Sequence, residues 1–164
     1  MNYRVCEALV LTKEDLGEKD ALVYLYNPFL GRIAAKVQSA RKITSKLNAH
    51  LEPGNLVTVQ LVKKNNYQLT DALVDNHLPR SQPFIKFLDF IKLMTAEGLD
   101  DGGLWHLLLA GRADYRRALR VLGFDPRFAG CEKCGRPPVF FLITQTNFWC
   151  EKCADPQWPD LLKF

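Results

Sequence analysis

Four cysteines in the last quarter of the sequence constrain its fold more than any other feature. They are spaced as C-x2-C, fifteen intervening residues and a second C-x2-C, at Cys131, Cys134, Cys150 and Cys153. A C-x2-C pair on a tight turn presents two sulfurs to one ion, and two such turns complete a closed tetrahedral set of ligands. The spacing therefore predicts a structural four-thiolate Zn²⁺ site, with no open position for a catalytic water.

The residues between the two cysteine pairs predict a small zinc ribbon. Gly135 follows the first pair and is suited to a positive φ, residues 139–143 are typical of a strand, and Thr146-Asn147 suggest a turn before the chain returns. Two disulfides, or four thiols without a metal, are the alternatives. The sequence begins without the apolar segment of a secretory signal, so we expect a reducing cytoplasm that disfavours disulfides. Cys6 is expected to be a buried thiol.

The composition is that of an ordinary globular protein, with 164 residues and 48% hydrophobic residues. This length allows one domain or two small ones. No apolar run approaches the roughly 20 residues that span a bilayer, so we expect a soluble cytoplasmic protein that makes no use of a membrane. The net charge of +4 is weak evidence for nucleic acid by itself.

The distribution of charge says more than its total. Between residues 32 and 64, seven basic residues face a single acid, Glu52, which leaves +6 in this segment and a net acidic remainder. Segregated positive charge favours contact with a phosphate backbone, although a solvated lysine-rich face is the alternative. The basic residues are Arg32, Lys36, Arg41, Lys42, Lys46, Lys63 and Lys64.

The apolar pattern predicts strands followed by helices. Strands are expected near residues 5–11, 21–26, 31–37, 56–62 and 67–74, and five short strands suggest a small closed barrel rather than a sandwich. Helical spacing then predicts one helix over residues 84–94 and a second over residues 104–122, ended by Gly123. We therefore expect an α+β protein of three parts, at residues 1–79, 80–128 and 129–164.

Several short segments, in this order, resemble the RecO family of bacterial recombination mediator proteins. The resemblance spans nearly the whole chain. It is carried by Ala8-Leu9-Val10-Leu11, Gly17-Glu18-Lys19-Asp20, Gly31-Arg32-Ile33, Ala40-Arg41-Lys42 with Ser45-Lys46, Leu51-Glu52-Pro53, residues 116–126 and Cys131-Glu132-Lys133-Cys134-Gly135. The family's usual Lys-Gly before the Ala-Arg pair is replaced here by Gln38-Ser39.

The resemblance implies an N-terminal OB-fold, a helical domain and a zinc module. It also implies binding of single- and double-stranded DNA, strand annealing, pairing with RecR, and docking of the acidic C-terminal tail of single-stranded DNA-binding protein (SSB) to help load RecA. On this basis the helical domain is expected to offer Arg112, Arg116, Arg117 and Arg120 to that tail, although a solvated helix face is the alternative.

We assign phosphate contact to the basic residues of the 32–64 segment, with Lys63 and Lys64 as secondary candidates at a hairpin tip. Tyr24, Tyr26 and Tyr67 are candidates for stacking on bases, or else for the core. The sequence has no P-loop and no G-x-S-x-G motif, and its three histidines are scattered, so we expect neither catalysis nor a small-molecule substrate. A zinc-ribbon module that binds proteins, with incidental nucleic-acid contact, is the competing hypothesis.

Overall fold

The computed structural model describes residues 2–38, 46–99 and 102–164. Two compact units are present, residues 1–113 and residues 114–164, and each is described by itself. The boundary between the units falls inside the segment predicted to be a separate helical domain. The division into three parts stays a prediction.

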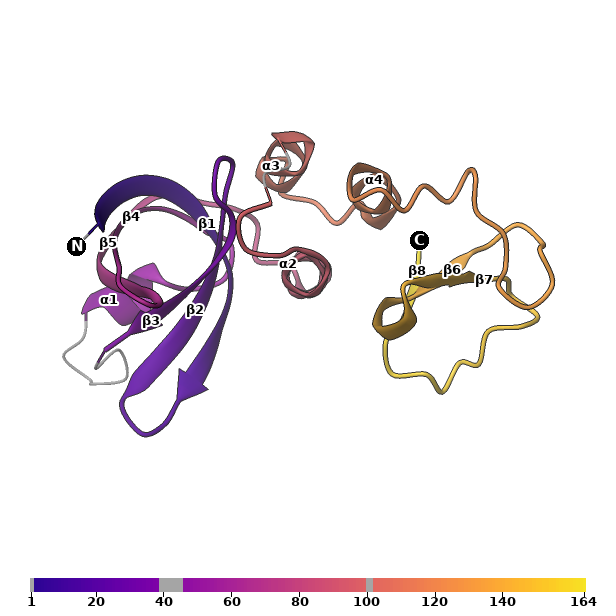
Figure 1. Cartoon of the computed structure of the whole chain (residues 1–164), viewed down its shortest axis with the longest axis horizontal. Coiled ribbons are helices and arrows are strands. Elements are labelled where there is room, and N and C mark those ends of the chain that lie inside the picture. The colour runs from indigo at the N-terminus through magenta and orange to yellow at the C-terminus, as the bar shows by residue number, and fades with distance from the viewer. Residues whose placement is uncertain (1, 39–45, 100–101) are drawn as a thin grey trace. The chain divides into compact units, whose positions relative to one another are not determined.

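Five strands of the first unit close into a barrel in the order β1-β2-β3-β5-β4 (Figure 1). Neighbouring strands are antiparallel except for β3 and β5, which pair in parallel over a short stretch. The strands are β1 (Asn2–Leu16), β2 (Asp20–Asn27), β3 (Gly31–Val37), β4 (Asn55–Lys63) and β5 (Tyr67–His77).

The strand β1 is long enough to belong to both sides of the barrel. Residues 2–9 pair with β4, and residues 9–16 pair with β2. The pairing with β2 continues to Leu16 and Asp20, so β1 runs beyond the strand expected near residues 5–11 and forms a hairpin with β2. Gly17, with a φ of 69°, makes the tight turn between the strands.

Alternation along the strands builds the core of the barrel. On β3, Ile33, Ala35 and Val37 are buried, and the residues between them are partly exposed. The same period of two buries Val57 and Val59 on β4. Because successive side chains of a strand point to opposite faces, this pattern fixes which residues point inward.

Helices cover parts of the barrel surface. The short helix α1 (Lys46–His50) lies against β5, between the strands expected near residues 31–37 and 56–62, where no helix was predicted. The helix α2 (Gln82–Met94) packs against β1 and buries the apolar stripe that includes Phe84 and Phe87, as its spacing predicted. The helix α3 (Gly102–Leu109) places Trp105 on Tyr26, with ring centroids 6.5 Å apart.

The single helix predicted over residues 104–122 is wrong, because the chain breaks into α3 and a second helix, α4 (Tyr115–Val121). Gly111 lies in the break with a φ of 67°, and a Cβ atom there would meet the Pro79 ring at 2.7 Å. Asp114 then caps α4, since its Oδ1 accepts a hydrogen bond from the Arg117 N–H at 3.0 Å. Turn and cap signals outweighed the apolar period.

The second unit continues into a three-stranded sheet of order β7-β6-β8. Its elements are β6 (Phe140–Leu142), the 3₁₀ helix η1 (Ile143–Gln145), β7 (Asn147–Trp149) and β8 (Leu161–Lys163). The strand β8 was not predicted. Within the described residues, every helix is too short or too polar to cross a membrane.

Candidate metal centre and nucleic-acid interface

Two similar turns present the four cysteines. The carbonyl oxygen of Cys131 accepts hydrogen bonds from the N–H groups of Cys134 and Gly135, at 3.3 and 2.8 Å. The carbonyl oxygen of Cys150 accepts in the same way from Cys153 and Ala154, at 3.1 and 3.0 Å. Gly135 has a φ of 70°, as predicted for the residue after the first pair. Both turns thus point two sulfurs toward one place.

The four sulfurs form one cluster. All four Sγ atoms lie within 4.8 Å of one another, and Cys134 Sγ is 3.6 Å from the sulfurs of both Cys150 and Cys153. A tetrahedron of sulfurs about 2.3 Å from a zinc ion has edges of about 3.8 Å. Disulfide sulfurs would lie about 2.05 Å apart, and all four cysteines are free thiols. The cluster therefore has the donor atoms and spacing for one soft divalent cation.

The thiol environment favours deprotonation on one side of the cluster. Burial raises the pKa of Cys131, but hydrogen bonds from backbone N–H groups outweigh it and lower the pKa to about 6. Hydrogen bonds with Cys134 and Cys150 raise the pKa of Cys153 to about 12. Without a cation, the cluster thus shares its remaining protons among close sulfurs. Metal ligation requires thiolates, so binding would release those protons.

Aromatic packing lies beneath the cysteine turns. Phe141 on β6 contacts Phe124 and Phe148, with ring centroids 5.4 and 5.0 Å away, and Phe148 meets Phe164 edge-on at 5.7 Å. The N–H of Glu132 donates to the Phe148 carbonyl at 2.9 Å, which ties the first turn to β7. A small core of this kind holds the turns in place but is too thin to be very stable alone.

The structure describes the side chains of four of the seven predicted phosphate-binding residues. Arg41 and Lys42 lie outside the described residues, and Lys46 begins α1 but its side chain is outside the description. Lys64 is exposed in the turn between β4 and β5. The remaining three, Arg32, Lys36 and Lys63, have partners within the barrel unit.

Those partners reduce the positive charge that the sequence count suggested. Lys36 pairs with Asp20 at 2.8 Å, and Lys63 pairs with Glu97 at 3.3 Å. Arg32 donates to the Lys92 carbonyl oxygen at 3.2 Å. Both carboxylates come from outside the 32–64 segment, so counting charges within that segment could not reveal them.

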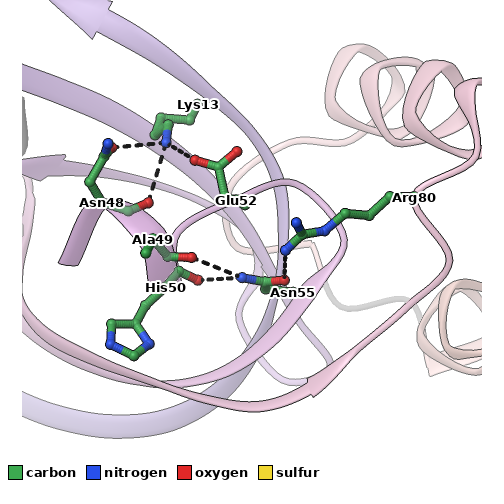
Figure 2. A network of polar contacts seen from close by, with 7 residues as sticks. All are labelled: Lys13, Asn48, Ala49, His50, Glu52, Asn55 and Arg80. Atoms are coloured by element: carbon green, nitrogen blue, oxygen red, sulfur yellow. Dashed lines mark hydrogen bonds and ion pairs between the residues drawn. The ribbon is translucent and has the colours of Figure 1, made fainter. Parts of the chain in front are cut away.

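The helix α1, which follows Arg41 and Lys42 in the sequence, is anchored to the barrel. Lys13 on β1 donates to the Oδ1 atom of Asn48 in α1 at 2.9 Å, and it pairs with Glu52 at 2.5 Å (Figure 2). Glu52 is the single acid of the basic segment, so its charge is offset by a lysine from outside the segment. The helix α1 and Glu52 are thereby held beside β1.

Asn55, which is fully buried, completes this anchor. Its Nδ2 atom donates to the carbonyl oxygens of His50 at 2.9 Å and Ala49 at 3.4 Å, while its Oδ1 atom accepts from Arg80 at 2.7 Å (Figure 2). The Nδ1 atom of His77 lies 2.8 Å from the same oxygen. Sequence reasoning missed Asn55, because nothing local marks a buried asparagine.

A hollow of about 290 Å³ lies over β3, between the β1–β2 turn and the β4–β5 turn. We call it the β3 hollow, and its lining residues are Leu16, Leu22, Ala34, Lys36, Asn65, Asn66, Tyr67 and Glu97. The Nζ atom of Lys63 lies 4.5 Å from the centre of the Tyr67 ring. The lining therefore combines one lysine, two amides, an aromatic ring and one carboxylate, with Lys63 beside the ring.

The tyrosines proposed for stacking lie in different environments. Tyr26 is fully buried under Trp105, which removes it as a stacking residue. Tyr24 is covered by two cations, with Lys92 Nζ at 4.3 Å and Arg32 Cζ at 5.6 Å from its ring centre. Tyr67 is 7% exposed, at the wall of the β3 hollow.

The arginines proposed for an acidic tail do not belong to one unit. Arg112 lies in the first unit, and the other three lie on α4 in the second. Arg116 donates to the Phe164 carbonyl oxygen at 3.5 Å, and Arg120 lies 3.8 Å from Asp125. Arg117 is exposed, with its backbone N–H bonded to the Asp114 cap.

Comparison with known proteins bears on the whole chain. Residues 1–75 match the family model described as "Recombination protein O N terminal". A DNA repair protein RecO from Streptomyces avermitilis is 27% identical over 92% of this chain and 74% of its own length. A protein of the same name from Streptomyces coelicolor is 28% identical over 92% of this chain and 74% of its own length. Another, from Cutibacterium acnes, is 34% identical over 83% of this chain and 54% of its own length.

Proposed function

Since this chain belongs to the RecO family, we propose that it is a recombination mediator of bacterial DNA repair. In this role it binds single- and double-stranded DNA in the cytoplasm, promotes strand annealing, and acts with RecR and SSB to load RecA. It carries out no catalytic reaction of its own. The relatives' shared name supports the repair role, and the β3 hollow is the observation that carries DNA binding.

The barrel is proposed to be an OB-fold. Its five-stranded order β1-β2-β3-β5-β4 supports this assignment. OB-folds bind oligonucleotides on the face of strands 2 and 3, between the loops that join strands 1 to 2 and strands 4 to 5. The β3 hollow lies at the corresponding strand and turns, with Lys36 in its lining and the Lys63 ammonium group beside the Tyr67 ring.

Phosphate contact is proposed for the basic residues of the 32–64 segment. Arg41 and Lys42 precede α1 in the sequence, Lys46 begins it, and Lys64 is exposed in the turn next to Asn65, which lines the β3 hollow. The remaining members must exchange protein partners for phosphate, so they add less affinity. The arginines of α4, with Arg112, remain candidates for the SSB tail.

The cysteine cluster is proposed to hold a structural Zn²⁺ ion. Four thiolates in a closed set suit zinc better than hard cations, and they leave no position for substrate. The ion would stabilise the second unit, whose small aromatic core supplies little stability by itself. The proposed role is therefore in folding and not in chemistry.

Anisotropy of a labelled single-stranded oligonucleotide, titrated with zinc-loaded protein at several salt concentrations, tests DNA binding. We expect micromolar or tighter affinity, with a log–log salt slope of about −0.7 for each phosphate neutralised. Replacing Arg41, Lys42 and Lys46 together by alanine should flatten the slope by about two units. The matched control replaces Lys86, Lys133 and Lys152, which lie on α2 and in the cysteine turns. Equal effects of the two triple variants would reject the assignment.

The second candidate function is a protein-binding module in which DNA contact is incidental. The ion pairs that offset Lys36 and Lys63 favour it, because they reduce the field over the β3 hollow. The same titration separates the two functions. A protein-binding module would bind DNA weakly, and its DNA affinity would not depend on Arg41, Lys42 and Lys46.

A further inference from the structure

Among the residues that the structure describes, one edge of β1 has no strand beside it. Residues 2–9 pair with β4 on one side, whereas pairing with β2 on the other side begins only at Leu9. Within the described part of the chain, the Nδ2 atom of Asn27 fills part of this gap, by donating to the Glu7 carbonyl oxygen at 2.6 Å.

The period of two in a strand identifies the exposed backbone groups. In an antiparallel strand, the N–H and C=O of one residue point to the same side, and those of the next residue point to the other. Because the Glu7 carbonyl points toward Asn27, the backbone groups of Val5 and Tyr3 point the same way. Among the described residues, these two have no backbone partner on that side.

Apolar side chains surround this open edge. Tyr3 and Val5 are 57% and 55% exposed, and Phe29, in the turn after β2, is 81% exposed. Together with Arg4, Cys6, Asn27 and Leu30 they line a hollow of about 390 Å³. Proteins usually protect such an edge with lysine, proline or a bulge, so an open apolar edge indicates a partner strand.

The wall opposite the edge is rigid, so the groove is formed before anything binds. The Oδ1 atom of Asn27 accepts hydrogen bonds from the N–H groups of Phe29 and Leu30, both at 2.9 Å. The same asparagine holds Glu7 through its Nδ2 atom. One side chain thus fixes the turn after β2 at a set distance from β1, which lowers the ordering cost of binding.

Charge identifies the class of occupant. Arg4 lines the hollow, is exposed, and makes no ion pair with the described residues. A second copy of the chain, paired antiparallel through the same short edge and centred on Arg4, would place Arg4 against Arg4, and like charges directly opposite are unfavourable. A strand that carries a carboxylate at this position would instead gain an ion pair.

We propose that the edge of β1 from Tyr3 to Val5 binds an extended segment of a partner protein, which adds a strand to the barrel. The segment carries apolar side chains at alternate positions, for the hollow beside Phe29, and a carboxylate that meets Arg4. Main-chain hydrogen bonds provide affinity and the side chains provide selectivity, as in other cases of strand addition. This site is distinct from the β3 hollow and does not require DNA.

The test uses a phage-displayed library of random nine-residue peptides, selected on the wild-type protein. Val5→Pro removes the outward N–H but leaves the ladder with β4, because the N–H of Val5 does not face β4. We expect selected peptides to bind this variant about tenfold or more weakly. The matched control Val5→Thr keeps the N–H and should stay within about threefold. DNA affinity should be the same in all three proteins.

Charge exchange tests Arg4. Arg4→Glu should weaken binding of the acidic peptides about tenfold, and replacing the peptide carboxylate by lysine should restore it. If Val5→Pro fails to fold, peptides N-methylated at alternate amides are used on the wild-type protein. Methylation of the peptide amides that face β1 should abolish binding, whereas methylation of the amides between them should not. Failure to select any peptide, equal binding to Val5→Pro, or dimerisation that this variant abolishes would each overturn the proposal.

Discussion

Replacing Asn55 by alanine is expected to destabilise the barrel by about 2 to 3 kcal/mol. The side chain is fully buried and makes three polar contacts of 2.7 to 2.9 Å, with the His50 carbonyl oxygen, Arg80 and His77. Each net hydrogen bond contributes about 1 kcal/mol, and a carbonyl left unpaired costs about 1 to 3 kcal/mol. Arg80 and His77 are exposed and regain water, so most of the loss comes from the half-buried His50 carbonyl.

Hydrogen exchange of the barrel amides measures this loss without assuming that the two units unfold together. A change of 2 to 3 kcal/mol should accelerate amides that exchange by global opening by roughly 30- to 150-fold. Asn76→Ala is the matched control, because that asparagine lies exposed on β5. Its effect should stay within about 0.5 kcal/mol. Equal exchange in the two variants would refute the view that Asn55 anchors α1 to the barrel.

Three further changes test the two units. Wild-type protein should retain about one equivalent of Zn²⁺ after dialysis. The Cys150→Ser variant should retain none, and its amide NMR spectrum should show that residues 114–164 are unfolded. The control variant Cys6→Ser should match the wild type in both measurements. Glu97→Gln removes the carboxylate of the β3 hollow and should tighten single-stranded DNA binding about two- to fivefold at low salt. An unchanged affinity would count against the β3 hollow as the DNA-binding site. Gly31→Ala should lower barrel stability by more than Gly17→Ala in urea unfolding. Both glycines have positive φ, but only at Gly31 would a Cβ atom collide with the chain after α2.

Local patterns carried most of what the sequence predicted correctly. Alternation placed the barrel strands, since burying one face of a strand imposes a period of two. The cysteine spacing predicted the cluster, because two turns of fixed geometry bring the sulfurs together wherever the rest of the chain runs. Helical spacing likewise placed α2, with Phe84 and Phe87 on its buried face.

Features that depend on distant partners were missed. The carboxylates of Asp20 and Glu97 reach Lys36 and Lys63 only because the barrel and the end of α2 bring them near, so a charge count along the chain overestimated the local field. The strand β8 has a weak apolar signal of its own and is defined by its pairing with β6. The break after α3 had local signals at Gly111 and Asp114, which the apolar period obscured.

The two pairings of β1 also impose an order of assembly during synthesis. Its second half meets β2 across a tight hairpin, with Leu16 beside Asp20, and loop closure over so short a distance is rapid. Its first half must wait for β4, since Asn2 pairs with Lys63. On a ribosome that adds about 5 to 20 residues per second, residues 2–8 therefore spend several seconds without the strand that pairs with them. A chaperone that shields nascent chains would meet this segment before any partner does.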